Sequence, residues 1–537
     1  MFATLWTQCE ILSRESVAGL AAAVTTIWLL GRWISSRRDR RAFPPGPPGL
    51  PVIGNLLDMP NVKEWLVYAE WARKYGDIVG VQMPGMSIVF LNKEEDAKAL
   101  FAARSGNYSD RAVTPMLRLG WDTVIGVTDT GNVFRALRRL FFKFLGPQAI
   151  KKTTAVQEKI IREAIVNLIH KPGDVQSHLK LAIGKLVLRL AYGYDMLNAE
   201  DPMLHWVDVA LEAFLQASRP NWTINFFPFL QYLPSWLPGM GFKKIASEYR
   251  TKSELSHDVP FNWVKEQIAA GTAQPSFALQ VLSDPDLAVD EAIVKEVLNN
   301  LYIAGADTII ATFSWFLSAM CLFPDVQRRA REEIDRLTGG TRLPCLDDRP
   351  SLPYLEALFK EVLRWNVVTN IGMLNFSAAL PHVSLAEDVY KGYCFPKGTV
   401  FMANVWSIMH DSNKYPDPFD FRPERFLDQH NGENNDGVEV NEDPNHFAFG
   451  FGIRQLHTIH SLTLPRICPG RHFADSVVWN LMAHILAACE ISKAEYPDGT
   501  AITANNIDYT SGIVSSPLPF TCNVAARSEQ TEALLVE

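Results

Sequence analysis

Cys468 is a candidate for metal chemistry because of the residues around it. It stands in Arg466-Ile-Cys-Pro-Gly-Arg471, downstream of Phe449-Gly-Phe-Gly452. A cysteine followed by Pro-Gly is typical of a tight turn, where backbone amides can point at the sulfur, and nearby arginines favour the thiolate. Because a thiolate can ligate iron, the pattern predicts a metal ligand at Cys468.

Two other patterns pair polar side chains. Glu361-Val-Leu-Arg364 places an acid and a base on one face of a helix, where they can share hydrogen bonds. In Ala304-Gly-Ala-Asp-Thr308 an acid and a hydroxyl stand side by side, which suits proton delivery, and the glycine loosens the helix. Alone, each motif is more often a solvated ion pair, an ordinary polar spot in a helix or a buried structural thiol.

A zinc site is the alternative use of this cysteine. His457-x-x-His460 precedes Cys468-x-x-x-His472, a set of residue types that zinc accepts. Structural zinc usually holds a small module together, and a chain of 60.3 kDa has a large core of its own. We therefore rank zinc below iron.

The composition excludes several classes of protein. With 47% hydrophobic and 20% charged residues the chain is neither disordered nor fibrous. A formal net charge of −8 argues against nucleic acid held on a broad basic surface. The 7 cysteines are scattered without a CxxC pair, so neither a disulfide framework nor a cysteine-rich zinc module is expected.

These residues need a mainly helical scaffold to position them. Residues 290–322 run without proline and are apolar on nearly every face in their second half, which indicates a buried helix or a membrane span. Asn299, Asn300 and Asp307 would be costly in lipid, so the pattern favours a helix through the centre of a large domain. Short strands are predicted at 78–82, 87–91 and 398–403. The predicted class is mainly α with small β-sheets.

The N-terminal end predicts a membrane anchor. Residues 17–30 carry no charge, and five arginines follow between positions 32 and 41, which predicts a single-pass helix with the rest of the chain in the cytoplasm. We predict an anchor at 1–36, a basic and Pro-rich hinge at 37–55, one catalytic domain at 56–522 and a loose polar tail at 523–537.

Taken together and in order, these motifs resemble the cytochrome P450 family of haem-thiolate monooxygenases. Cys468 falls where the family has its axial cysteine, and Glu361-x-x-Arg364 matches the family's Glu-x-x-Arg. Pro423-Glu-Arg-Phe426 resembles the segment that adds an arginine, here Arg425, to a buried network with that pair. Ala304 and Gly305 match the kinked oxygen-binding turn. The resemblance implies the cytochrome P450 fold over essentially the whole chain.

The resemblance also implies a cofactor and roles for residues. Haem b would be held by the Cys468 thiolate on its iron, with Arg138, His382 and Arg466 on the propionates. Asp307 and Thr308 would relay protons to bound oxygen. Electrons would come from NADPH through a membrane-bound reductase, and exposed Arg135, Arg139 and Lys143 form a basic patch suited to an acidic donor. A solvated face is nearly as good an account of that patch.

The substrate segments that the resemblance implies are 111–124, 214–229, the turn before Ala304, 369–380 and 511–517. They are apolar with a few aromatics, among them Trp121, Phe214, Phe226 and Phe227, which favours a lipophilic small molecule. The sequence style is similar to the fungal microsomal branch used in secondary metabolism, whose range includes terpenoids, polyketides and alkaloids. We therefore expect an endoplasmic reticulum membrane protein.

Three departures from the family pattern stand out. Residues 453–465 replace a single residue of the family's haem loop, so about twelve are extra, and a misplaced splice boundary is the cheapest explanation. Residues 370–380 are also longer than in relatives. Phe134 stands where relatives often have tryptophan, which loses one donor to a propionate. Two hypotheses follow: an active monooxygenase, or an inactive membrane-anchored protein of the same fold with a disrupted haem loop.

Overall fold

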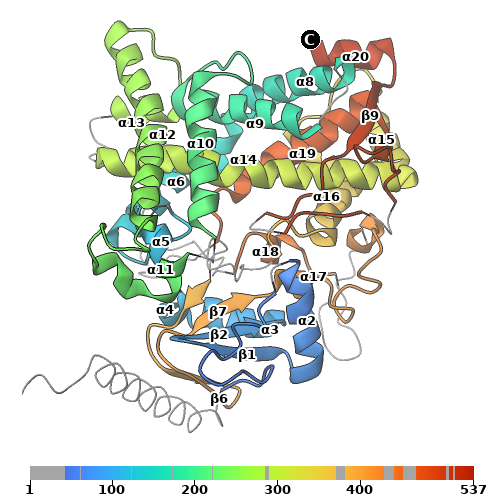
Figure 1. The fold of residues 1–537 in the computed structure, drawn as a ribbon. Coiled ribbons are helices and arrows are strands. Elements are labelled where there is room, and N and C mark those ends of the chain that lie inside the picture. The colour runs from blue at the N-terminus through green and yellow to red at the C-terminus, as the bar shows by residue number, and fades with distance from the viewer. Residues whose placement is uncertain are drawn as a thin grey trace, which may run out of the picture.

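The computed structural model describes residues 43–60, 62–121, 124–171, 175–219, 222–284, 289–370, 381–427, 441–451, 467–503, 507–511 and 514–536. Helices form most of the molecule and the sheets are small (Figure 1), so the predicted class is confirmed. The predicted N-terminal anchor lies outside the described residues.

The helices follow one another along the chain with short connections. In the first half they are α2 (Glu64–Tyr75), α3 (Glu94–Ala97), the π-helix η2 (Lys98–Ala103), α4 (Ser105–Tyr108), α5 (Pro115–Arg118), α6 (Asn132–Leu145), α7 (Pro147–Lys151), α8 (Thr154–His170), α9 (Val175–Tyr192), α10 (Pro202–Ala217), α11 (Thr223–Phe226), η3 (Pro228–Tyr232) and α12 (Phe242–Ala270). In the second half they are α13 (Phe277–Leu282), α14 (Glu291–Leu322), α15 (Pro324–Thr338), η4 (Leu346–Ser351), α16 (Pro353–Trp365), α17 (Val405–Met409), η5 (Pro423–Phe426), α18 (Asn445–Ala448), α19 (Arg471–Ala488) and α20 (Glu529–Val536).

The larger sheet has the strand order β1-β2-β7-β4-β3. Its members are β1 (Ile78–Met83), β2 (Met86–Leu91), β7 (Val400–Ala403), β4 (His382–Val383) and β3 (Asp110–Arg111); smaller ribbons pair β5 (Asp388–Tyr390) with β6 (Tyr393–Phe395) and β8 (Cys489–Glu495) with β9 (Thr521–Ala526). β1 and β2 are antiparallel, while β2 and β7 are parallel. The three strands predicted from the sequence are therefore confirmed.

Both faces of this sheet are covered. Alternate residues of β2 and β7 enter two separate apolar clusters: Val89, Leu91 and Phe401 lie in one, and Ile88, Phe90, Val400 and Met402 in the other. Successive side chains of a strand point to opposite faces, so a run of apolar residues fits a strand buried on both sides. The core of the helical part is a third, larger cluster centred on α14 and α19.

Helix α14 crosses the helical part of the molecule (Figure 1). It starts where predicted, with the Asp290 carboxylate accepting a hydrogen bond from Ala292 N at 3.0 Å, and it ends before Pro324. By length and composition this helix could cross a membrane, and 72% of its most apolar stretch is buried inside the protein. That burial favours the predicted core helix.

The Pro-rich segment is attached to the domain from Phe43 onward. Gly80 N donates to Pro45 O at 2.9 Å, and Phe43 packs beside the sheet cluster. A Cβ on Gly46 would lie 2.0 Å from Gly80 O, so only glycine allows this contact. The described part of the predicted hinge is thus a docked strap along β1.

The expectation of a loose polar tail from 523 is wrong. Residues 521–526 form β9, which pairs with β8, and α20 follows. Cys522, Val524 and Leu535 are buried, and Arg527 pairs with Asp335 on α15 at 2.5 Å. A few buried apolar anchors and one long-range ion pair order a segment whose composition is mostly polar.

Candidate active site

Cys468 lies in the turn that leads into α19. Its backbone N donates to Phe449 O at 2.9 Å, which ties the turn to the aromatic segment before it. The amides of Gly470 and Arg471 point at the sulfur. The side chain is exposed to solvent although its neighbours are core residues. The predicted turn geometry is therefore present.

Two opposing influences act on this thiol. Closely surrounding protein atoms raise the pKa of Cys468, while the Gly470 and Arg471 amides and the charges of Arg138 and Arg471 lower it. Burial is the larger effect, so the pKa is raised overall. A cation on the sulfur would reverse this balance, because a coordinating thiol is deprotonated outright.

Arg138 reaches this turn from α6. The helix is amphipathic and buries Phe134, Leu137 and Phe141, which leaves Arg138 at the edge of the buried face. Its Nη1 donates to Ile467 O, next to the cysteine. Burial lowers the pKa of Arg138, and the Cys468 thiolate partly restores it.

His382 belongs to β4 and is also held close to the aromatic segment. Its ring stacks on Phe101 with centroids 3.9 Å apart, and Phe101 in turn lies 6.1 Å from Phe451. Nδ1 lies 2.5 Å from Tyr108 O; because a carbonyl only accepts, Nδ1 is the nitrogen that carries hydrogen. This contact fixes the orientation of the ring.

The turn 304–308 interrupts the burial of α14. Ala304 is exposed and Gly305 and Thr308 are half-buried, although most residues of the helix are buried. A Cβ on Gly305 would have no neighbour within 4 Å among the described residues. The chain stays α-helical here, so the expected kink is absent from this stretch; the Thr308 hydroxyl instead donates toward Ala304 O at 3.1 Å and Gly305 O at 3.3 Å.

Asp307 occupies a charged cluster that the sequence motif did not reveal. Burial raises the pKa of Asp307, nearby Lys180 lowers it and Asp208 raises it again. Lys180 pairs with Asp208 at 3.0 Å, and Tyr302 donates to Asp208 at 3.1 Å. Lys180 and Asp208 come from α9 and α10, and no local pattern links them to α14.

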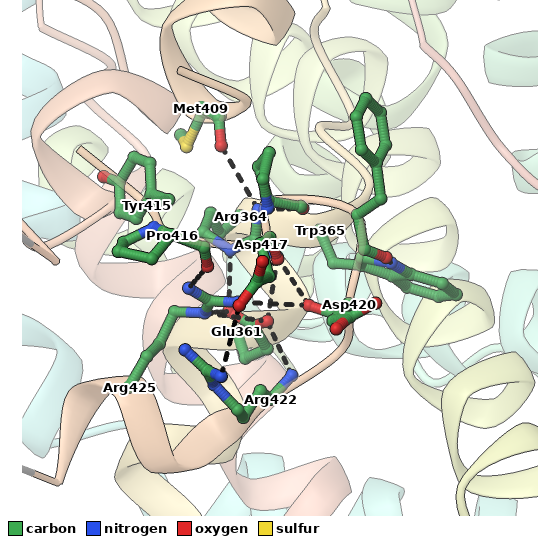
Figure 2. A network of polar contacts seen from close by, with 12 residues as sticks. Glu361, Arg364, Trp365, Met409, Tyr415, Pro416, Asp417, Asp420, Arg422 and Arg425 are labelled. Atoms are coloured by element: carbon green, nitrogen blue, oxygen red, sulfur yellow. Dashed lines mark hydrogen bonds and ion pairs between the residues drawn. The ribbon is translucent and has the colours of Figure 1, made fainter. Parts of the chain in front are cut away.

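Glu361, Arg364 and Arg425 meet in one buried network (Figure 2). Arg364 Nε and Nη2 donate to the two Glu361 oxygens at 2.7 and 2.8 Å, and Arg425 Nε donates to Glu361 at 3.2 Å. The Arg422 amide also donates to Glu361, at 2.8 Å.

The two arginines use their remaining donors on backbone carbonyls. Arg364 donates to Met409, Pro418 and Asp420, and Arg425 donates to Pro416, Asp417 and Asp420. Both side chains and Glu361 are fully buried. The network thus joins α16 to the loop 416–425, which has little regular structure to hold it.

Comparison with known proteins decides the family. The family model for cytochrome P450 matches residues 44–522. The chain belongs to the cytochrome P450 family. It is 37% identical over 525 residues to cytochrome P450 monooxygenase 208 of Postia placenta, covering 97% of each chain. It is 35% identical over 528 residues to cytochrome P450 monooxygenase claR of Ampulloclitocybe clavipes, covering 97% of this chain and 92% of that one.

A third relative, cytochrome P450 monooxygenase COX2 of Coprinopsis cinerea, is 34% identical over 533 residues, which cover 98% of this chain and 97% of that one. These fungal relatives identify the chain as an oxidoreductase of the monooxygenase class, and the P450 family uses haem iron. The side chains described above fit that group: an exposed sulfur, an exposed turn of α14 and cations nearby.

The predicted substrate segments of this P450 partly converge. Met116, Leu117, Trp121 and Val124 form one apolar cluster with Phe214, Ile224 and Ile303, the residue before Ala304. Trp121 and Phe214 meet edge to face at 5.4 Å. From the 511–517 segment, Ser515 O accepts from Trp315 on α14 at 3.0 Å. Phe227 is exposed and does not belong to the cluster.

Some predicted positions lie outside the described residues. These are Arg466, the insertion 453–465 with His457 and His460, and residues 371–380. Among the residues that the structure describes, no group of three or more His, Cys, Asp or Glu is arranged to hold a metal ion.

Proposed function

We propose that this P450 binds haem b through the Cys468 thiolate and inserts one oxygen atom from O₂ into a lipophilic small molecule. The observation that carries the proposal is the Cys468 sulfur, exposed and faced by two backbone amides at the start of α19. Arg138, His382 and Arg466 would hold the propionates, because cations and imidazole N–H groups form charge-assisted bonds with carboxylates.

Haem, when bound, supplies the iron at which O₂ is reduced and split. The protein supplies the rest. Cys468 gives electron density, and its amide donors keep the sulfur in place. Asp307 holds a proton at its carboxyl group more readily than a solvent-exposed acid, since burial raises its pKa. Thr308, one residue on, offers a hydroxyl that passes the proton to oxygen.

The apolar cluster of Trp121, Phe214 and Ile303 supports a lipophilic substrate, which we assign to fungal secondary metabolism, as a terpenoid, polyketide or alkaloid. NADPH would supply electrons through a reductase docked on Arg135, Arg139 and Lys143, which are exposed on α6. The uncharged segment 17–30 supports a single-pass anchor in the endoplasmic reticulum membrane.

A catalytically inactive P450-fold protein is the second candidate. The insertion 453–465 favours it, because these residues interrupt the sequence between Gly452 and Arg466. The spliced transcript across this stretch separates the two candidates: loss of the extra residues from mature message removes the main support for inactivity.

The test is oxygen incorporation from isotopically heavy O₂. The full chain is combined with a fungal P450 reductase, NADPH and a panel of terpenoid, polyketide and alkaloid substrates, with Cys468→Ala as the control. We expect a product carrying one heavy oxygen atom that is absent with the control. If no substrate is oxidised although the reductase transfers electrons to the haem, the inactive alternative is favoured.

A further inference from the structure

The backbone of the segment between α5 and α6 is held by side chains from three other helices. We define this α5–α6 segment as residues 114–121 and 124–128; it supplies much of the apolar cluster beside Ala304. The three contacts are Met116 N to Asn225 Oδ1 at 3.1 Å, Arg250 Nε to Leu119 O at 2.9 Å and Ile125 N to Asn300 Oδ1 at 3.2 Å.

The contact made by Asn300 is buried and its amide can face only one way. Asn300 Nδ2 donates to the Glu296 carboxylate at 2.5 Å and to Glu296 O at 2.7 Å. Both acceptors require the nitrogen, so the amide oxygen is left to accept from Ile125 N. Asn300, Glu296 and Ile125 are all buried, where an unpaired N–H would be costly.

Glu296 is set in turn by a histidine on α12. His257 Nε2 lies 3.1 Å from Glu296 Oε2, and His257 Nδ1 lies 2.5 Å from Ser253 O. Both ring nitrogens thus face oxygen acceptors, an arrangement that the imidazolium satisfies. The Asn299 amide nitrogen lies 3.1 Å from the same Nε2; turned over, that amide accepts from Nε2 with an oxygen that otherwise has no partner among the described residues.

We propose that Asn300, oriented by the ion pair of Glu296 with His257, is a positioning residue that fixes the α5–α6 segment and with it one wall of the substrate site. The inference rests on the proposed function only for the identity of that wall. The chain of contacts itself runs from α12 through α14 to Ile125, so a side chain that touches no substrate controls the shape of the site.

Hydrogen exchange tests the clamp directly. In the full-length protein, Asn300→Leu removes the acceptor for Ile125 N while keeping a side chain of similar size. We expect peptides that contain Ile125 to exchange roughly tenfold faster. Peptides from α16 serve as an internal reference and keep their wild-type rate, which separates local release from general unfolding.

Two variants sharpen this test. Glu296→Gln keeps an acceptor for Asn300 Nδ2, so we expect protection of Ile125 close to wild type. Ser318→Ala is the matched control, because the Ser318 hydroxyl is buried in the same helix and bonds only Ser314 O, at 2.9 Å. Unchanged exchange at Ile125 in Asn300→Leu, or equal loss in Ser318→Ala, would overturn the proposal.

Azole binding reports on the shape of the substrate site. Phenylimidazole and imidazole both ligate haem iron, but only the first needs space beyond the iron. In Asn300→Leu we expect the affinity for phenylimidazole to change severalfold and that for imidazole to stay the same. Equal effects on both azoles would contradict the positioning role. If the wild type binds neither azole, the proposed haem site fails, while the exchange result still decides the clamp.

Discussion

The residues of the candidate site differ in how their charges are compensated. Glu361 receives two arginines and a backbone amide, so its charge is fully paired. Asp307 sits beside another acid, and burial raises its pKa. The first arrangement builds structure and the second keeps a proton available. Single-residue changes should therefore separate stability from turnover.

Replacing Glu361 by glutamine should cost about 3–5 kcal/mol of the free energy of unfolding, because two buried guanidinium groups lose their counter-charge. Chemical denaturation measures this cost. The matched control is Glu332→Gln, which removes an exposed pair with Arg328 at 2.7 Å and should cost no more than about 0.5 kcal/mol. Equal costs for both variants would contradict a structural role for the network.

Asp307→Asn should lower NADPH-dependent turnover by roughly 100-fold, the size of a typical general-acid contribution, with little change in stability. Asparagine keeps the shape of the side chain but cannot carry the proton. Turnover with a fixed reductase concentration measures the effect, and Asp325→Asn, exposed on α15, is the control. Wild-type turnover in Asp307→Asn would remove this residue from the proton path.

His257 should make stability depend on pH. Burial lowers its pKa, but the hydrogen bond and charge of Glu296 outweigh burial and raise it above 6.5. Asp258 also raises it; Lys295 pairs with Asp258 at 2.8 Å, and Tyr192 lies near Glu296.

A raised histidine pKa stabilises the fold fully below the unfolded value and loses that effect as the pH rises through the folded value. The stability advantage of the wild type over His257→Gln should therefore shrink between about pH 6 and about pH 8.5. Denaturation at several pH values measures it. An advantage that grows with pH would mean that His257 is buried in its neutral form.

At the scale of elements, the sequence predicted those with a strong local pattern. The strands β1, β2 and β7 and the helix α14 have continuous apolar stretches with clear ends, such as Asp290 and Pro324. The C-terminal β9 and α20 were missed because their anchors are few and distant. Cys522 and Val524 alternate with polar residues, and Arg527 depends on Asp335, far away in the chain.

Deleting residues 527–537 should lower the free energy of unfolding by about 2–4 kcal/mol, from the buried Leu535 and the ion pair with Asp335. Thermal unfolding of the full chain and the truncated chain measures the loss. Val536→Ala is the control, since Val536 is 77% exposed and should change stability little. An unchanged melting temperature after truncation would restore the interpretation as a loose tail.

For the whole molecule, motifs and their order predicted the family, and local spacing predicted the Glu361 and Arg364 pair. Long-range partners were beyond a single sequence: Lys180 and Asp208 beside Asp307, and His257 beside Glu296, meet only because helices α9, α10 and α12 pack around α14. Arg138 was expected near the cysteine turn, and the structure places it on Ile467 O.

The central claim is that Cys468 ligates haem iron in this chain as its sequence stands. The carbon monoxide difference spectrum of the reduced full-length protein tests it most directly, with Cys468→Ala as the control. We predict a strongly red-shifted Soret band in the wild type, the sign of a thiolate on iron, and its loss in the variant. An imidazole-like band or no band in the wild type would contradict the claim, and recovery of the band after removing the extra residues between Gly452 and Arg466 would assign the fault to that insertion.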